Sequence, residues 1–293
     1  MDATKIFLDH RELLFSLVYN LLGTVADTED VLQETWLVWA PRSRQGEPIA
    51  NPRAYLVRVA VNAALARRVS ISRRKEDYVG PWLPEPLVSP VQAGESDPAV
   101  RAESVSMALM VVLETLTPLE RAVFVLHEVF GYAHTEIAPI LERSPSAIRQ
   151  LAHRAREHVQ ARRPRHRPDP ALRRQVTERF LAAVTGGDLG ALMAVLAPEV
   201  TLWADGGGKA RAAGARPVHG RDRVAQLIIG DSRRRPVPDL GVRLVRVNGE
   251  LSALLMSGGS PFAVIVLELS ADGGQVCGVY AVTNPDKLAR IGG

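Results

Sequence analysis

One stretch of the chain, GPWLPEPLVSP at residues 80–90, limits how the rest can fold, because four of its eleven residues are proline. Proline fixes the backbone angle φ and has no N–H donor, so this stretch can form neither a helix interior nor a central strand. It also carries Trp82 and Leu83, whose apolar surface is expected to be covered rather than left in water. We therefore predict that a linker divides the folded parts and that this linker itself docks.

The composition sets the remaining bounds. With 293 residues, of which 46% are apolar, the chain is expected to form two or three domains with substantial cores. Its single cysteine, Cys277, excludes an internal disulfide framework and a zinc site built from cysteines. The sequence shows neither a signal peptide nor an apolar run of the roughly 18 residues that a membrane span needs. We expect a cytoplasmic protein with no membrane partner, no cofactor and no metal.

Charge is unevenly distributed along the chain. Residues 1–75 carry 11 Lys/Arg and 8 Asp/Glu, and residues 104–167 carry 9 and 6. Residues 76–103, between them, carry 1 and 6. Two basic modules that flank an acidic linker suit a polyanion such as nucleic acid, although ordinary solvated surface explains the charges equally well.

The first module, residues 1–75, reads as helical throughout. A stripe of Leu14, Leu17, Val18 and Leu21 indicates one amphipathic helix. The sequence DTEDVLQETWLVW (27–39) places acids in the first turn of a second helix, where the helix dipole favours them. Its inner face is expected to be Leu32, Thr35, Trp36 and Trp39, with Asp30, Gln33 and Glu34 outside.

A third helix is expected from NPRAYLVRVAVNAALARR (51–68), with Asn51 as N-cap and Pro52 at the first helical position. We predict a buried stripe of Leu56, Val59, Ala60 and Ala63. Another face would then carry Tyr55, Arg58 and Asn62. The helix runs into RRVSISRRK (67–75), a basic segment.

The second module, residues 104–163, contains the pattern of a helix-turn-helix. Thr117, Pro118 and Glu120 form a capping box at a helix start, and Gly131 ends that helix. A short helix over 136–142 follows, and Ser144 caps another whose buried stripe is Ile148, Leu151, Ala152, Ala155 and Val159. Its outer face would carry Arg149, Gln150, His153, Arg154 and Arg156, which suits entry into a DNA major groove. A plain helical hairpin with a basic face is the alternative, since the turn lacks the usual glycine.

The third module, residues 171–293, follows a basic linker at 164–170 and reads as α+β. Helices are expected at 171–184, from Asp188 to about 197 and at 220–230, and a strand at 200–204. Two hairpins follow, at 242–256 with Asn248-Gly249 as the turn and at 262–283. This order resembles the SnoaL-like fold, an α+β cone around a pocket. Candidate pocket residues for an enzyme are Trp203, Asp205, His219 and Tyr280, although such residues are more often structural.

Three motifs, DTEDVLQETW, NPRAYLVRVAVNAAL and the helix-turn-helix, resemble the extracytoplasmic-function (ECF) sigma factors in order and spacing. The resemblance implies a region-2 domain, a linker and a region-4 domain. It implies that core RNA polymerase is contacted by Asp27, Asp30, Gln33 and Glu34. It assigns the −10 element to Arg58, Asn62, Arg67 and Arg68. It assigns the −35 element to Ser146, Arg149, Gln150, His153 and Arg154.

Three further stretches resemble the class of ECF sigma factors that carries a SnoaL-like C-terminal extension: WLPEP (82–86), DGGGK (205–209) and NPDKL (284–288). Taken from the residues alone, DGGGK lacks the spacing of a phosphate-binding loop, and NPDKL reads as a helix cap after the last strand. The resemblance implies that the extension regulates the factor in cis, in place of a separate membrane anti-sigma protein. By charge, Lys209 and Lys287 are candidate partners of Glu85. The regulatory set is Trp82, Leu83, Pro84, Glu85, Pro86, Asp205, Gly206, Gly207, Gly208, Lys209, Asn284, Pro285, Asp286, Lys287 and Leu288.

The sequence therefore predicts a multidomain sigma factor, not an enzyme, with two all-α sigma domains and an α+β C-terminal domain. Its partners would be core RNA polymerase and promoter DNA, and a small ligand in the C-terminal domain is left open. Two other classes are kept as alternatives. One is a one-component helix-turn-helix regulator with a small-molecule pocket, and the other is a cyclase-like enzyme fused to a DNA-binding module.

Overall fold

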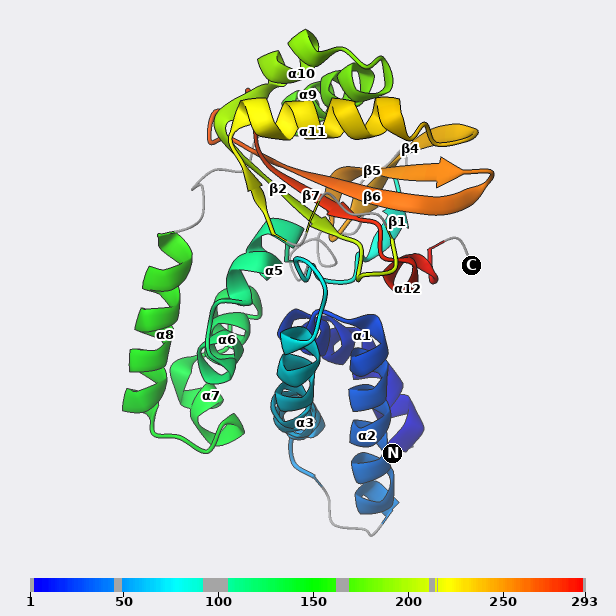
Figure 1. The fold of residues 1–293 in the computed structure, drawn as a ribbon. Coiled ribbons are helices and arrows are strands. Elements are labelled where there is room, and N and C mark those ends of the chain that lie inside the picture. Colours follow the sequence, from blue (N-terminus) through cyan, green and yellow to red (C-terminus); the bar gives the residue numbers. More distant parts are fainter. Residues whose placement is uncertain are drawn as a thin grey trace. The chain divides into compact units, whose positions relative to one another are not determined.

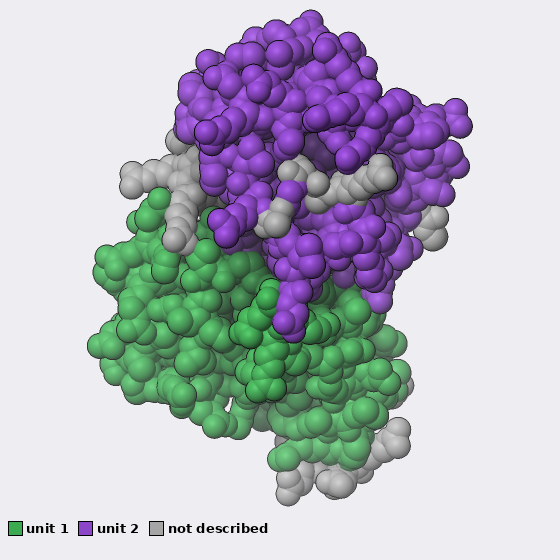
Figure 2. All heavy atoms as spheres, in the orientation of Figure 1, with its two compact units in different colours: residues 1–76, 97–105, 112–162 green, residues 77–96, 106–111, 163–293 purple. Residues whose placement is uncertain are grey.

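The helices and strands gather into two compact units in a computed structural model that describes residues 3–44, 49–91, 105–161, 169–210, 214 and 216–291. Unit 1 comprises residues 1–76, 97–105 and 112–162, and unit 2 comprises residues 77–96, 106–111 and 163–293 (Figure 2). The linker from residue 77 onward thus belongs to the same unit as the C-terminal domain. Each unit is described separately below.

Unit 1 begins with three helices that pack on one another: α1 (Ala3–Leu22), α2 (Val25–Arg44) and α3 (Pro52–Glu76) (Figure 1). The stripe predicted for α1 is confirmed, since all four residues are at most 2% exposed. On α2, Leu32, Thr35 and Trp39 are buried, and the Trp39 indole donates a 2.9 Å hydrogen bond to the Ala3 carbonyl. This bond ties the end of α2 to the start of α1.

The buried face of α3 differs from the sequence prediction by one position. Leu56 and Ala60 are buried as predicted, but Val59 and Ala63 are only half-buried. The core face instead consists of Leu56, Val57, Ala60, Val61, Ala64, Arg68 and Ile71. Arg68 lies four residues after Ala64, so helical periodicity turns it inward.

The rest of unit 1 contains the helix-turn-helix. Its elements are α6 (Pro118–Phe124), a π-helix η1 (Val125–Val129), α7 (His134–Ile140) and α8 (Pro145–Gln160), and they follow α5 (Met107–Leu113), of which residues 107–111 belong to unit 2. Both predicted caps are confirmed, at Thr117 and at Ser144. The short helix lies two residues earlier than predicted. The turn without glycine is made by Glu142, which adopts a left-handed φ of 54° at a cost of about 1–2 kcal/mol.

Unit 2 is an α+β domain, as predicted. Its sheet has the order β1-β4-β5-β6-β7-β2-β3, formed by β1 (Val88–Pro90), β2 (Leu196–Asp205), β3 (Val218–His219), β4 (Leu240–Val247), β5 (Glu250–Ser257), β6 (Ser260–Leu269) and β7 (Val276–Val282). Its helices are α9 (Pro170–Thr185), α10 (Leu189–Val195), α11 (Arg221–Arg234) and α12 (Pro285–Leu288). Both hairpins are confirmed, and Asn248 and Gly249 have the two positive φ values of a type I′ turn. The helix that Asp188 caps ends at Val195, so residues 196 and 197 belong to β2 rather than to that helix.

Successive residues of the sheet supply two different cores. Leu267 of β6 and Val279 of β7 belong to the core under α9, α10 and α11, which cover one face of the sheet in Figure 1. Val266 and Tyr280, the next residues along, belong to a second core on the opposite face. That second core also contains Leu83 of the linker, Met107 of α5 and Leu288 of α12.

The proline-rich linker therefore covers the second face of this sheet. Residues 88–90 of the linker form β1, which pairs antiparallel with β4 at the edge of the sheet. An edge strand tolerates Pro90, because no further strand needs the N–H that proline lacks. Leu83 is fully buried, and Pro84, Glu85 and Pro86 are also buried. The linker docks, as predicted, because the second face of the sheet is apolar and would otherwise be exposed to water.

Replacing Leu83 with alanine should destabilise unit 2 by about 2–5 kcal/mol, because it empties a fully buried site. Val79→Ala is the matched control, since Val79 is 61% exposed and its truncation should change stability by less than about 0.5 kcal/mol. Hydrogen exchange of β5–β7 peptides in increasing urea would report this unit separately. Equal stability of the two variants would contradict the docked placement of Leu83.

Candidate functional site

The outer face of α8 presents all five residues predicted to read the −35 element. Ser146, Arg149, Gln150, His153 and Arg154 are exposed, whereas the stripe from Ile148 to Val159 is buried. Arg154 pairs with Glu120 at 3.1 Å, and His153 lies 3.3 Å from Glu157. The His153–Glu157 pair is exposed on both sides, and such pairs are worth little and can be exchanged for phosphate or base contacts.

The acids predicted to bind polymerase occupy two environments on α2. Asp30, Gln33 and Glu34 are exposed, and Arg67 of α3 pairs with Asp30 at 2.7 Å and also with Glu34. Asp27 is instead buried and accepts hydrogen bonds from Thr24 at 2.6 Å and Arg74 at 2.8 Å. Burial alone would raise the pKa of Asp27, but the bonds from Thr24 and Arg74 outweigh it and lower the pKa.

The residues predicted for the −10 element are also divided. Arg58 and Asn62 are exposed, and Arg67 is partly exposed beside the α2 acids. Arg68 is only 6% exposed, and its guanidinium donates to the Leu21 carbonyl at 2.8 Å and to Glu114 at 3.2 Å. In this conformation Arg68 therefore has structural contacts instead of the expected exposure to DNA. The reason is that Arg68 lies on the buried face of α3.

Glu114 collects three cations in unit 1. Its carboxylate accepts from Arg68 at 3.2 Å, from Arg121 at 2.5 Å and from Lys75. Arg121 is fully buried and also donates to the Asn20 carbonyl at 2.9 Å. Burial would raise the pKa of Glu114, but Arg121, Lys75 and Arg68 hold it far below the usual range. Sequence reasoning missed this cluster, although a single acid closing the apolar run MALMVVLE was a usable signal.

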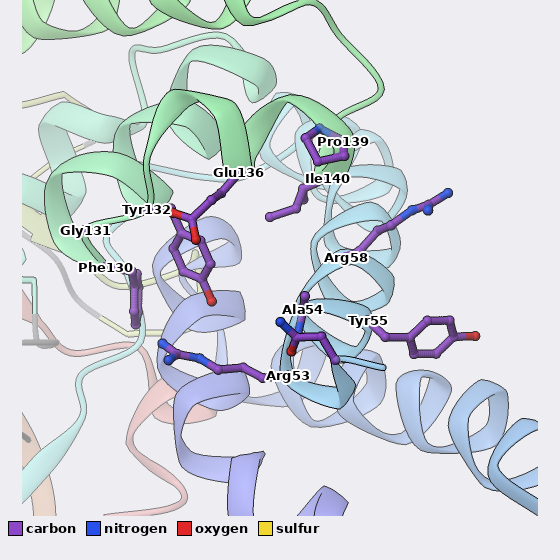
Figure 3. Close-up of a pocket in the computed structure, with 11 residues that line it drawn as sticks. Arg53, Ala54, Tyr55, Arg58, Phe130, Gly131, Tyr132, Glu136, Pro139 and Ile140 are labelled. Atoms are coloured by element: carbon purple, nitrogen blue, oxygen red, sulfur yellow. The ribbon is translucent and has the colours of Figure 1, made fainter. Parts of the chain in front are cut away.

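A cavity of about 650 Å³ lies between the start of α3 and the helix-turn-helix (Figure 3). Tyr55 and Arg58 come from α3, and Tyr132, Glu136 and Ile140 come from the other side. Arg58 pairs with Glu142 at 3.1 Å. Arg58, which is expected to act at the −10 element, is thus paired in this conformation with Glu142 in the turn of the helix-turn-helix.

In unit 2 the three motifs WLPEP, DGGGK and NPDKL converge on the carboxylate of Asp205. Asp205 is 0% exposed and lies at the end of β2. One oxygen accepts the Leu83 N–H at 2.8 Å and the Lys287 ammonium at 2.7 Å. The other oxygen accepts the Tyr78 hydroxyl. All four residues belong to unit 2.

Lys287 completes the contact with the linker. It is 6% exposed, and its ammonium donates to the Leu83 carbonyl at 2.5 Å and lies 3.8 Å from the centre of the Trp82 ring. Asp205 and Lys287 therefore bind the N–H and the C=O of the same linker residue, Leu83. A buried ion pair is favourable only when further hydrogen bonds satisfy both charges, and these two are so satisfied.

Asn284 and Tyr78 extend the cluster. The Asn284 amide donates to the Tyr78 hydroxyl at 2.8 Å, and its backbone N–H donates to the Asp205 carbonyl at 3.0 Å. Burial is the main cause that raises the pKa of Tyr78 above its ordinary value, and the hydrogen bond to Asp205 is the second. Tyr78 therefore stays a neutral donor to the carboxylate.

The glycines of DGGGK allow this close approach. Gly207 has φ +60°, and a Cβ there would lie 2.3 Å from the Asn284 amide nitrogen. Gly208 has φ +70°, and its Cβ would lie 3.2 Å from Val79. Lys209 donates to Asp286 at 2.5 Å. The loop thus packs against the linker and α12. Of the two lysines that are candidate partners of Glu85, Lys209 pairs with Asp286 and Lys287 pairs with Asp205.

Comparison with known proteins identifies the helical modules. The models of sigma-70 region 2 and sigma-70 region 4 match residues 6–74 and 106–159. The ECF RNA polymerase sigma factor SigJ of Mycobacterium tuberculosis is 40% identical over 289 residues, which cover 95% of this chain and 90% of SigJ. The chain belongs to the ECF family of RNA polymerase sigma factors. A probable ECF sigma factor from the same species, SigI, is 32% identical over 97% of this chain and 95% of SigI.

The likeness to SigJ extends to the fold of the whole sigma factor. The crystal structure of SigJ matches with a TM-score of 0.75 at 36% identity, over 98% of each chain. This sigma factor therefore recognises promoters and initiates transcription with core RNA polymerase and promoter DNA as partners. A one-component regulator would have no use for a region-2 module, so that alternative is not favoured.

The extension of the sigma factor has a cavity of about 1090 Å³, but the enzyme residues predicted from the sequence do not line it. Leu202, Ala204, Val279 and Ala281 line it, so alternation turns Trp203 and Tyr280 to the opposite face. Asp205 belongs to the linker cluster, which comprises Tyr78, Leu83, Asp205, Asn284 and Lys287, and His219 is hydrogen-bonded to Thr201 at 3.0 Å. These four candidate residues thus have structural contacts, which is the role expected more often of such residues from the sequence.

The described residues were also compared with the requirements of a membrane span and of a metal site. None of the described helices has the length and apolar character of a membrane span. No described group of three or more His, Cys, Asp and Glu side chains is arranged to hold a metal ion.

The Glu114 cluster predicts a pH dependence of unit 1. Burial lowers the pKa of Lys75 to about 8, whereas an unfolded lysine titrates near about 10.4. Between these values the unfolded state binds more protons than the folded state, so the free energy of unfolding rises with pH. Lys75→Met should abolish this rise, and Lys5→Met, at an exposed lysine, should keep it. Urea unfolding of each variant between pH 7.5 and about 10.4 measures the difference, and parallel curves for wild type and Lys75→Met would contradict the prediction.

Proposed function

We propose that unit 2 restrains this sigma factor in cis by holding the linker on its sheet. The observation that carries the proposal is the double hydrogen bonding of Leu83, whose N–H binds Asp205 and whose C=O binds Lys287. The same linker connects region 2 to region 4, so its docking limits how the two modules can separate. The equilibrium between docked and released linker would then set activity.

Unit 1 supports the same proposal. The Glu114 cluster joins α3 of region 2 to Arg121 of region 4. Promoter elements at −10 and −35 are centred about 25 base pairs apart, which is about 85 Å of duplex at 3.4 Å per base pair. Modules in direct contact cannot reach both elements, since even α3, with 25 residues, is only about 37 Å long. The compact arrangement of unit 1 is therefore a resting state that opens on the promoter.

Individual roles in the open state follow from exposure and chemistry. Asp30, Gln33 and Glu34 would bind core polymerase, with Asp27 supporting them from beneath. Arg58, Asn62 and Arg67 would act at the −10 element, and the exposed face of α8 would read the −35 element. Since none of the four candidate enzyme residues is among the described residues that line the cavity of the extension, we propose that the extension regulates and does not catalyse. The sigma factor would act in the cytoplasm, where it meets core polymerase.

Lys287→Met should raise promoter output, because it leaves Asp205 as a buried charge without its ammonium partner and weakens linker docking. Lys209→Met is the matched control, since the Lys209–Asp286 pair is exposed and worth at most about 1 kcal/mol. Truncation after Thr283 should raise output further, because it removes Asn284, Lys287 and Leu288 but keeps strands β1 to β7. Deletion of residues 170–293 should instead lower output, because it also removes the scaffold that covers Leu83 and Met107, and the two sigma modules then lose their relative placement.

Run-off transcription with core polymerase at matched protein concentrations measures these four outputs. Trp82→Ala, made in the full chain and in the chain truncated after Thr283, should have the smaller effect in the truncated one. Identical output from all of these proteins would contradict regulation in cis while leaving sigma activity intact.

Arg149→Ala should lower affinity by about 1–3 kcal/mol at one −35 position and leave other positions unchanged, because an arginine fork pairs bidentately with guanine. Arg149→Lys retains the charge but loses the fork, and it should show nearly the same loss of specificity. Holoenzyme binding to a panel of single-base −35 variants measures both effects. A uniform loss over all bases that lysine restores would indicate a phosphate contact instead.

A further inference from the structure

The cavity of unit 2 lies on the face of the sheet opposite the linker. It has a volume of about 1090 Å³ and opens between α9, α11 and the sheet. Ligand sites in proteins typically have about 300–1,000 Å³ and are lined mostly by apolar side chains. The body of this cavity is lined by Phe180, Leu202, Ile228, Leu255, Ile265 and Val279.

The mouth of the cavity is cationic. Arg233, Arg234 and Arg235 line it and are exposed, and Asp231, the one acid among the lining residues that the structure describes, lies 3.4 Å from Arg235. Arg233 donates to the Gly187 carbonyl at 2.8 Å and Arg234 to the Gly230 carbonyl at 3.0 Å. These bonds orient the two side chains, and a guanidinium with five N–H donors retains others for an anion.

The cavity shares its wall with the linker cluster. Ala204, Ala210 and Thr283 line the cavity, and each adjoins a residue of the DGGGK or NPDKL motif. The Asp205 carbonyl accepts the Thr283 N–H at 2.8 Å and the Thr283 hydroxyl at 3.2 Å. A molecule in the cavity would therefore contact the backbone that positions Asp205 and Asn284.

We propose that this cavity binds a small apolar molecule with a carboxylate head, of which a medium-chain fatty acid is the simplest example, and that its occupancy stabilises the docked linker. The apolar chain fills the space between Phe180 and Val279, and the carboxylate meets Arg233 and Arg234 at the mouth. The binding step stands independently, whereas its effect on the linker rests on the proposed regulation in cis.

Titration calorimetry of the full chain with decanoate, 1-decanol and decylammonium tests binding without any transcription assay. Decanoate should bind in a 1:1 ratio, 1-decanol more weakly and decylammonium most weakly. Ile228→Trp, which fills the cavity from α11, and Ala281→Leu, which fills it from β7, should each weaken decanoate binding about tenfold or more.

The double variant Arg233→Gln/Arg234→Gln should weaken decanoate binding about tenfold and leave 1-decanol binding unchanged. Arg223→Gln, at an exposed arginine of α11 outside the cavity, is the matched control. Absence of binding by all three probes, binding that both filling variants leave unchanged, or decylammonium binding as tightly as decanoate would each overturn the ligand assignment.

Hydrogen exchange of the peptide that contains Leu83 tests the coupling. Saturating decanoate should slow it about fivefold or more, and Lys287→Met should weaken decanoate binding by a corresponding factor, since coupling is reciprocal. Unchanged exchange with decanoate bound would overturn the coupling alone. Cis regulation itself is judged by transcription from Lys287→Met, so its failure is distinguishable from failure of the ligand proposal.

Discussion

The paired hydrogen bonds to Leu83 are the interaction on which the arrangement of unit 2 depends. Asp205 and Lys287 neutralise each other in the interior while one binds the N–H and the other the C=O of a single linker residue. Neither charge is tolerable there alone, because an unpartnered buried ion costs several kcal/mol. The linker, β2 and α12 thus meet at one buried ion pair.

The two faces of the sheet explain why a linker rather than a further helix takes this role. One face is covered by α9, α10 and α11, and the other is apolar and covered by Leu83, Met107 and Leu288. Prolines hold the linker extended and so lower the entropy lost on docking. Release would expose apolar surface on both the linker and the sheet, and this favours the docked state.

Local features of this fold could be read from the sequence, and long-range ones could not. The Thr117 and Ser144 caps, the α8 stripe and the Asn248-Gly249 turn follow from neighbours in the chain, and all are present. On α3 the predicted stripe, Leu56, Val59, Ala60 and Ala63, differs from the buried face and leaves Arg68 outside. Continuing the apolar positions Val57, Ala60, Val61 and Ala64 would have placed it inside. The partner of Asp205 is a linker amide 122 positions away, and only three-dimensional structure reveals that pairing.

A disulfide staple tests most directly whether the docked linker restrains initiation. Ser89 and Arg246 are directly paired on β1 and β4, and paired residues of antiparallel strands lie about 4.5–5.5 Å apart at Cα, within reach of a disulfide. In a Cys277→Ser background, S89C/R246C would lock the linker on the sheet when oxidised. We predict that run-off transcription by the oxidised protein falls well below that of either single-cysteine variant and recovers on reduction. Equal initiation by the oxidised, verified staple and its reduced form would contradict the account.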